Sequence, residues 1–321
     1  MDWEITMSET KHITRTIITS TLTLAVWTAA PAQDLPFTLT EVGPNVWAAI
    51  GGANPATGSN AGFVIGDDGV VVIDTFASAA GAEQLLAEVR RRTKLPVRFV
   101  VNTHHHLDHV AGNAVFIEAG ALVLAHRNVH GWIRPENLRL LGLSGSAVNP
   151  ELKAMVEGIA LPAMGYDDEL DLHLGSRLVR VRWMPGHTGG DSVVTIPDAR
   201  VVFTGDLFWH RGLPNLIDAT TASWIETLDA LSAAGPDSAF VPGHGGLGRA
   251  VDVTAFREYL ATLRRLVSDA RERRFTGDAL AATVRPTLAE RYGQWDFFEY
   301  LAAPNILQTE EELNGTKRVP R

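Results

Sequence analysis

The sequence predicts a layered α/β protein with two β-sheets and a helical end, and three observations point to this class. Short apolar runs bounded by glycine, proline and aspartate recur up to about residue 244, as expected of buried strands. Segments whose apolar residues recur at helical spacing separate several of these runs. After Val251 the helical spacing continues almost to the end of the chain. The order sheet, helices, sheet, helices suggests two halves packed face to face.

The first half opens with a predicted hairpin, because Asp67-Asp68-Gly69 is a tight-turn sequence between two apolar runs. A helix is expected next, with Leu85, Leu86 and Val89 on one face. The predicted elements are strands over 63–66 and 70–74, a helix over 78–92, a strand over 97–102, a helix over 113–119 and a strand over 121–125. This alternation is typical of a layered α/β protein.

The second half has the pattern of a largely antiparallel sheet. Its predicted strands cover 170–174, 178–183, 192–196 and 201–203. Gly175, Pro185-Gly186 and Pro197-Asp198 separate these strands as turn residues. The segment Ser223-Trp224-Ile225-Glu226 matches a capping box, which predicts that a helix begins there. A last strand is expected over 241–244.

No glycine- or serine-rich linker divides the chain, so we expect one domain, 33–250, with a helical C-terminal extension, 251–321, packed on it. The apolar stripe of this extension consists of Phe256, Tyr259, Leu260, Leu263 and Val267. Its aromatic segment, 295–300, leaves two uses open: closing a pocket or forming a homo-oligomer contact.

The first 32 residues have the pattern of a secretory signal peptide. Lys11 and Arg15 precede a mildly apolar stretch, and Ala30-Pro31-Ala32 fits a small-residue cleavage site. The mature chain is then expected to begin at Gln33 and to be periplasmic or secreted. The alternative is an anchor helix, but the stretch is short and rich in threonine, whereas a spanning helix needs about 20 mostly apolar residues. We expect no stable membrane insertion after cleavage.

Charge and cysteine content narrow the partners and cofactors. The formal net charge is −9 and no long basic run is present, so nucleic acid is not an expected partner. The chain has no cysteine, so any metal site must use histidine and carboxylate ligands.

Residues 103–113, THHHLDHVAGN, crowd four histidines and an aspartate together directly after a predicted strand. Because extended backbone alternates its side chains, His104 and His106 would converge on one point and His105 would turn away. Asp108 and His109 could meet at a neighbouring point. Imidazole and carboxylate are ligands that a zinc-like ion accepts, so two adjacent cations are plausible.

Two ligands are too few for each ion, and three further candidates occur downstream. His187, Asp206 and His244 each follow a predicted strand and have glycine beside them, which lets backbone pass close to a crowded centre. Taken singly, each histidine could be a packed core residue, Asp206 a helix cap, and HHHLDH a pH-responsive surface loop. Their joint occurrence favours a metal site.

The motifs occur in a recognisable order. They are His104-x-His106-x-Asp108-His109, Gly186-His187-Thr188, Thr204-Gly205-Asp206 and Pro242-Gly243-His244-Gly245. Together they resemble the motif set of the metallo-β-lactamase-fold hydrolases over about residues 46–244. The resemblance implies a four-layer αββα sandwich with the site at one edge, between the sheets.

The resemblance also implies a ligand set for two zinc ions. His104, His106 and His187 would hold the first ion; Asp108, His109 and His244 would hold the second; and Asp206 would bridge the two. Asp74 resembles an early aspartate of the family that supports the ligands from behind. Of the other histidines beyond residue 32, His105, His126, His130, His173 and His210 are not expected to be ligands, although His210 could face the substrate.

The function implied is that of an exported zinc-dependent hydrolase acting on an ester, lactone, thioester or lactam of a small molecule. Asp108 would be the catalytic residue that orients the hydroxide and passes its proton on. A true β-lactamase is a less favoured alternative, because such enzymes resembling this chain usually lack an aspartate at the Asp206 position. Glyoxalase II-like thioesterases and lactonases keep one.

Two alternatives from another class stay open. The same ligands could hold iron for a sulfur-oxidising step, or the chain could be a metal-loaded, non-catalytic accessory of a periplasmic redox system.

The pocket wall is expected from residues 129–166, or these residues form ordinary helix cores instead. The apolar side chains of that region are Trp132, Leu138, Leu140, Leu141, Leu143, Met155 and Met164.

Overall fold

The computed structural model describes residues 35–52, 54–143, 149–233, 235 and 237–320. The predicted signal peptide, 1–32, lies outside these residues. None of the described helices is both long and apolar enough to cross a membrane.

The first sheet has seven strands in the order β1-β2-β3-β4-β5-β6-β7. They are β1 Thr38–Gly43, β2 Val46–Ile50, β3 Ala61–Ile65, β4 Val70–Ile73, β5 Val97–Val101, β6 Leu122–His126 and β7 Met164–Tyr166. The predicted hairpin is confirmed, because β3 and β4 pair antiparallel and the Gly66 N–H donates to the Gly69 carbonyl at 2.9 Å. From β4 to β7 the pairing is parallel, so the carboxyl ends of these strands lie at one edge of the sheet.

The second sheet has five strands in the order β12-β11-β10-β9-β8. They are β8 Glu169–Leu174, β9 Arg177–Trp183, β10 Ser192–Ile196, β11 Val201–Trp209 and β12 Ala239–His244. Pairing is antiparallel except between β11 and β12, which confirms the predicted pattern. β11 runs six residues beyond its predicted end and is buried throughout, so it carries the chain past Asp206 to Trp209.

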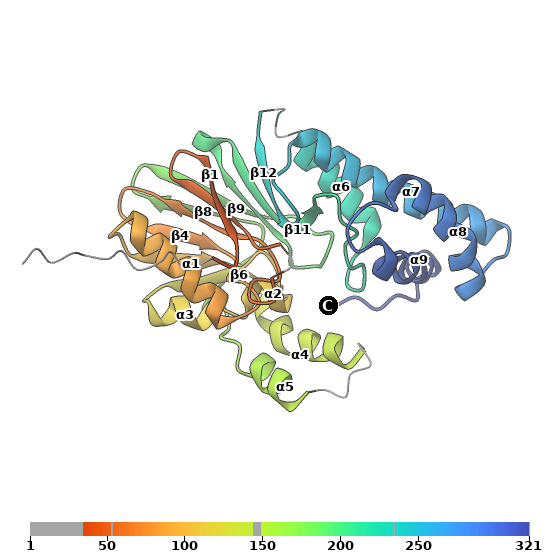
Figure 1. Ribbon diagram of the computed structural model, residues 1–321, viewed down its shortest axis with the longest axis horizontal. Coiled ribbons are helices and arrows are strands. Elements are labelled where there is room, and N and C mark those ends of the chain that lie inside the picture. The colour runs from red at the N-terminus through yellow and green to blue at the C-terminus, as the bar shows by residue number, and fades with distance from the viewer. Residues whose placement is uncertain (1–34, 53, 144–148, 234, 236, 321) are drawn as a thin grey trace, which may run out of the picture. The chain divides into compact units, whose positions relative to one another are not determined.

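The two sheets face each other, and helices cover their outer faces (Figure 1). Between the sheets, Val71 and Val101 of the first pack in one apolar cluster with Val194 and Phe203 of the second. The helices α1 Ala79–Arg92 and α3 Asn113–Glu118 share a cluster with the opposite face of the first sheet. The helices α6 Thr221–Ser232 and α7 Ala250–Glu272 share one with the second sheet. The predicted αββα sandwich is therefore confirmed.

The remaining helices lie at one edge and at the C-terminus. They are α2 Leu107–Val110, α4 Arg127–Leu143, α5 Pro150–Glu157, α8 Gly277–Tyr292 and α9 Phe298–Asn314, with a short 3₁₀ helix, η1 Pro197–Ala199. The predicted stripe on α7 is buried, with Phe256, Tyr259 and Leu263 fully covered. Because α7, α8 and α9 share their apolar cluster with α6 and β11, the helical end is part of the same core.

The predicted capping box at Ser223 is wrong. The helix α6 begins at Thr221, and the Ser223 hydroxyl donates to the Thr220 carbonyl. The N–H and hydroxyl of Thr221 donate to the Glu312 carboxylate of α9 at 3.0 and 2.8 Å. A carboxylate from a distant helix thus supplies the acceptor and the negative charge that a helix start favours, which no local sequence pattern reveals.

Candidate metal centre

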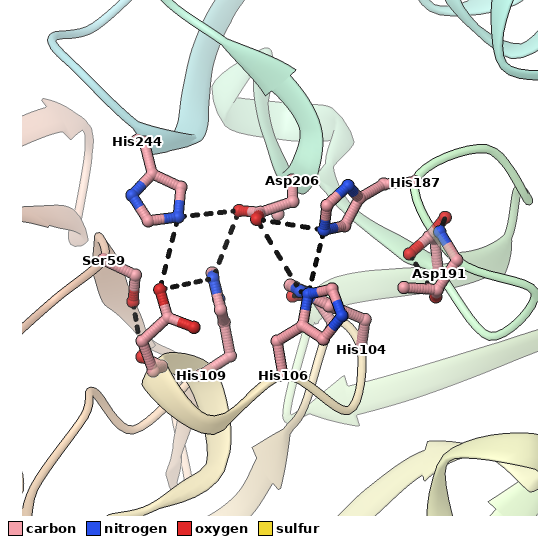
Figure 2. Close-up of polar contacts among 12 residues, drawn as sticks. Ser59, His104, His106, His109, His187, Asp191, Asp206 and His244 are labelled. Carbon is pink, nitrogen blue, oxygen red and sulfur yellow. Dashed lines mark hydrogen bonds and ion pairs between the residues drawn. The ribbon is translucent and has the colours of Figure 1, made fainter. Parts of the chain in front are cut away.

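The histidine-rich segment leaves β5 at the sheet edge and is held there by Asp74, which follows the neighbouring strand β4. Asp74 lies at a positive φ of 57°, and its carboxylate accepts the N–H and the hydroxyl of Thr103, both at 2.7 Å. His106 is the N-cap of α2, so Asp108 and His109 fall on the first turn of that helix. This local geometry sends His104, His106 and His109 toward the side chains of Asp206, His187 and His244 (Figure 2).

Four donor atoms from three segments form a first cluster. Nδ1 of His106 lies 3.1 Å from Nε2 of His104 and 2.9 Å from Nε2 of His187. Oδ2 of Asp206 lies 3.3 Å from Nε2 of His187 and 3.8 Å from Nε2 of His104. Figure 2 shows the side chains of His104, His106 and His187 pointing toward Asp206.

A second cluster adjoins the first through the other oxygen of Asp206. Oδ1 of Asp206 lies 3.1 Å from Nε2 of His109 and 3.3 Å from Nε2 of His244. Oδ2 of Asp108 lies 3.7 Å from Nε2 of His109 and 3.3 Å from Nε2 of His244. The structure therefore brings together all seven residues that the sequence indicates as ligands, and Asp206 stands between the two groups.

The residues of these clusters fit divalent cations. Four ligands at 2.0–2.1 Å around a tetrahedral ion lie about 3.3 Å from one another, close to the separations in both clusters. Within the described chain, Nε2 of His109 and Oδ1 of Asp206 are buried without a hydrogen-bond partner of good geometry. Buried polar atoms are rarely left without a partner, and a bound cation between them would supply one. Imidazole and carboxylate, without thiolate, form a donor set suited to zinc or iron.

Two glycines make room for Asp206. A Cβ on Gly243 would lie 1.9 Å from Oδ1 of Asp206. Gly205 has a φ of +50°, and a Cβ there would lie 2.5 Å from the Thr103 hydroxyl. Glycine at these positions therefore lets β12 approach Asp206 of β11 and lets β11 approach Thr103, as the sequence indicates for a crowded centre.

In three of the histidines, the ring nitrogen that faces away from the clusters contacts another polar side chain. Nδ1 of His109 lies 2.8 Å from Asp74, and Nδ1 of His104 lies 3.1 Å from the Thr103 hydroxyl. Nε2 of His106 lies 3.3 Å from Oδ2 of Asp218. Such contacts hold each ring in place and select the nitrogen that keeps its lone pair. Sequence reasoning anticipates Asp74 but misses Asp218, which lies in an irregular segment without a motif.

The two clusters differ in their protonation. Burial lowers the pKa of His187 to about 3 and lowers that of His104, so both rings are neutral at pH 7. Burial alone would also lower the pKa of His244, but the carboxylates of Asp206 and Asp108 raise it to about 9. The pKa of His109 is raised in the same way. The second cluster thus carries positive charge on its histidines where the resemblance places a cation.

The loop that carries His187 is organised by Asp191. Its carboxylate accepts the N–H of Gly186 at 2.9 Å and the N–H and hydroxyl of Thr188 at 2.7 and 2.6 Å. Asp191 is buried beside the first cluster (Figure 2). Sequence reasoning misses this residue, although its place at the end of the turn Gly186–Asp191 is a signal for a loop-closing acceptor.

A cavity of about 270 Å³ opens onto both clusters. Besides the candidate ligands, it is lined by Leu107, Asn137, Leu140, Leu141, Trp209 and Asn215. The wall expected from residues 129–166 thus includes Leu140 and Leu141. Trp132 packs on His105 instead, Leu138 joins the apolar cluster of α4 and α5, and Met155 and Met164 are exposed, while the Leu143 side chain lies outside the described part.

Trp209 is the wall residue that sequence reasoning misses. Its ring stacks on His244 with the ring centroids 3.9 Å apart. The Phe297 ring packs against it in a T-shaped arrangement, with the centroids 5.8 Å apart. His210, for which the sequence leaves a substrate-facing position open, turns away: its Nδ1 lies 3.0 Å from the Gly246 carbonyl, and it does not line the described cavity. Of the C-terminal aromatic segment, Trp295 packs on Tyr259 and Tyr292. Phe297 alone of these aromatics reaches the cavity wall in the described structure.

A two-sheet sandwich with paired histidine and aspartate clusters at the sheet edge defines a protein with a candidate dinuclear metal centre. Residues 54–244, more than half of the chain, match the metallo-beta-lactamase superfamily model. The chain therefore belongs to the metallo-β-lactamase superfamily.

Similar proteins include the hydroxyacylglutathione hydrolases of Brucella ovis and Brucella abortus. Each is 33% identical over 147 residues, which cover 46% of this chain and 47% of the relative. This chain thus spans about half the length of the curated relatives it matches. Among solved structures, a metallo-beta-lactamase from Pontibacter korlensis is similar, with a TM-score of 0.56, 23% identity and coverage of 70% of this chain and 99% of that chain. This likeness supports the fold.

Proposed function

We propose that this protein is a metal-dependent hydrolase that uses two zinc ions to cleave an ester, lactone, thioester or lactam of a small molecule. The observation that carries the proposal is the sharing of Asp206: its two oxygens complete two adjacent donor clusters at the floor of one cavity. The relatives named as hydroxyacylglutathione hydrolases support hydrolysis, and thioesters belong to the proposed range.

Each ion would take three side chains and one oxygen of Asp206. His104, His106 and His187 would hold the first, and Asp108, His109 and His244 the second. A bound pair of such cations supplies hydroxide at neutral pH and polarises a carbonyl oxygen. Asp206 and all of these histidines except His244 are almost fully buried, and the His244 side chain is 14% exposed, so their part is to bind and orient.

Asp108 is proposed to have a catalytic role in addition to binding metal, because it is the acidic candidate ligand that solvent reaches. Its side chain is 30% exposed, against 3% for Asp206, and it lines the cavity. Burial would raise the pKa of Asp108, but His109 and His244 hold it well below its usual range, so the side chain is anionic at neutral pH. Its Oδ2 faces the second cluster, which leaves the other oxygen to hold the attacking water and accept its proton.

Metal analysis combined with a substrate panel tests the proposal. The purified chain should contain close to two zinc ions, and it should hydrolyse at least one member of a panel of esters, lactones, thioesters and lactams. One iron per chain with a sulfur-oxidising activity would overturn the proposal. Full zinc content with no turnover across the panel would overturn it in favour of a non-catalytic accessory role. Turnover confined to lactams would make the protein a β-lactamase proper.

We also propose that the protein is exported, because residues 1–32 have the pattern of a secretory signal peptide. The test is N-terminal sequencing of the protein from the periplasmic and secreted fractions of an expressing bacterium. A start at Gln33 supports export, and an intact N-terminus in the cytosolic fraction overturns it.

A further inference from the structure

The cavity over the two clusters is mostly apolar, and apart from the candidate ligands it is uncharged. Leu107, Leu140 and Leu141 lie on one side, from α2 and α4, and Trp209 lies beside His244. No lysine or arginine lines this cavity in the part of the chain that the structure describes. The volume of about 270 Å³ is near the lower end for small-molecule sites, so the bound group is compact.

Two of the guanidinium groups on or beside α4, those of Arg139 and Arg318, are already paired. Arg139 follows Asn137 by two residues, yet it bonds to the buried carboxylates of Glu136 and Asp218. Arg318 donates to both oxygens of Glu136 at 2.8 Å. Redirecting Arg139 to a ligand would remove one cationic partner from both buried carboxylates, and redirecting Arg318 would remove one from Glu136, which is costly. These cations therefore do not offer a site for an anionic substrate.

The polar side chains that line the cavity leave few free hydrogen-bonding groups for a ligand. The Asn137 amide oxygen accepts the Leu107 N–H, and its nitrogen donates to the carbonyls of His105 and Ile133. The Asn215 amide oxygen accepts the Ile217 N–H, which leaves its NH₂ group as one neutral donor for a ligand. Two divalent cations at the floor of the cavity would have half of their charge offset by the carboxylates of Asp108 and Asp206. The other half of the positive charge would face the carbonyl group that reacts.

We propose that the cavity selects uncharged, apolar acyl compounds and discriminates against thioesters of glutathione, whose leaving group carries two carboxylates and an ammonium. This inference rests on the proposed hydrolase function and narrows its substrate class. The reaction is the addition of water to the acyl carbon, with cleavage of the carbon–sulfur or carbon–oxygen bond, release of the thiol or alcohol and formation of the carboxylic acid. A carboxylate placed against the leucine wall would lose its water without gaining a partner.

The test compares two thioesters of one acyl group on the zinc-loaded full chain. One leaving group is glutathione and the other is N-acetylcysteamine, which is uncharged. The expected kcat/KM is at least about tenfold higher for the neutral thioester, because tenfold corresponds to about 1.4 kcal/mol, a modest cost for an unpaired carboxylate. Leu140→Arg should lower this preference about tenfold by improving KM for the glutathione thioester. The matched control is Leu122→Arg, at an exposed leucine that does not line the cavity, and it should leave the preference unchanged.

Binding separates this inference from the proposed function. The uncleavable thioethers S-hexylglutathione and N-acetyl-S-hexylcysteamine are titrated into the same protein by calorimetry. Tighter binding of the neutral thioether supports the inference even if neither thioester is hydrolysed, a result that would contradict only the hydrolase proposal. Equal or tighter binding of the glutathione compound, or a preference for its thioester in turnover, would overturn the inference and leave the hydrolase standing.

Discussion

Nε2 of His106 lies 3.3 Å from Oδ2 of Asp218, on the far side of the ring from the Nδ1 atom that faces the first cluster. Asp218 is buried and also bonds to Arg139. Burial would raise the pKa of Asp218, but His105 and His106 hold it well below its usual range, so it accepts the Nε2 proton of His106. The Nδ1 lone pair is thereby kept for a cation.

Asp218→Asn should lower the affinity of the first cluster for its metal ion about 10- to 100-fold, because the neutral amide no longer fixes the proton on Nε2 of His106. The second ion should be affected much less, since its candidate ligands do not contact Asp218. Competition with a chelator measures the two affinities separately. Asp229→Asn is a matched control, at an exposed carboxylate paired with Arg257. Equal weakening of both ions by Asp218→Asn would contradict a specific role for Asp218.

The His105 and His106 pair tests the predicted alternation of side chains. His106→Ala should remove the first metal ion and nearly all turnover, because its Nδ1 lies at the centre of the first cluster. His105→Ala should leave the metal content near normal, since its ring packs on Trp132 outside both clusters. Because His105 is fully buried, this variant should still lose on the order of 2–4 kcal/mol of stability. The measurements are metal analysis and urea unfolding, and equal metal loss in both variants would show the alternation to be wrong.

Lys317 gives the unfolding free energy a dependence on alkaline pH. Its ammonium donates to the carbonyls of Leu216 and Ala219, on both sides of Asp218, and burial lowers its pKa from 10.5 to about 8. Between pH 8 and 10.5 the unfolded chain therefore binds more protons at this site than the folded one. Stability relative to Lys317→Met should then rise with pH in this window and be independent of pH below it.

Urea unfolding of the metal-free protein and of Lys317→Met at pH 7, 8, 9 and 10 measures this difference. The exposed Lys153, changed to Met, serves as the control and should give a flat difference. A difference between wild type and Lys317→Met that stays flat, or that falls only as the pH approaches 10, would show that the two carbonyl bonds favour the ammonium at least as much as burial disfavours it.

The sequence predicts those features of the fold and site that depend on local pattern. Turn residues define the hairpin, and the apolar stripe defines the buried face of α7. Glycine beside each isolated ligand candidate indicates the crowded centre. Asp218 and Trp209 could not be found in this way, because their roles come from segments far apart in the chain. The start of α6 is missed for the same reason, since its acceptor is Glu312 of α9.

The crowding around Asp206 predicts a sharp difference between two neighbouring glycines. In Gly243→Ala, the added Cβ would lie 1.9 Å from Oδ1 of Asp206, the oxygen that faces His109 and His244. The carboxylate must move away, so binding of the second metal ion should be weakened or lost and the melting temperature of the protein should fall. Gly246→Ala is the matched control, because its Cβ would come no closer than 3.9 Å to a neighbour. Metal analysis and thermal unfolding of both variants check this, and two zinc ions retained in Gly243→Ala would contradict a role for Oδ1 of Asp206 in holding the second ion.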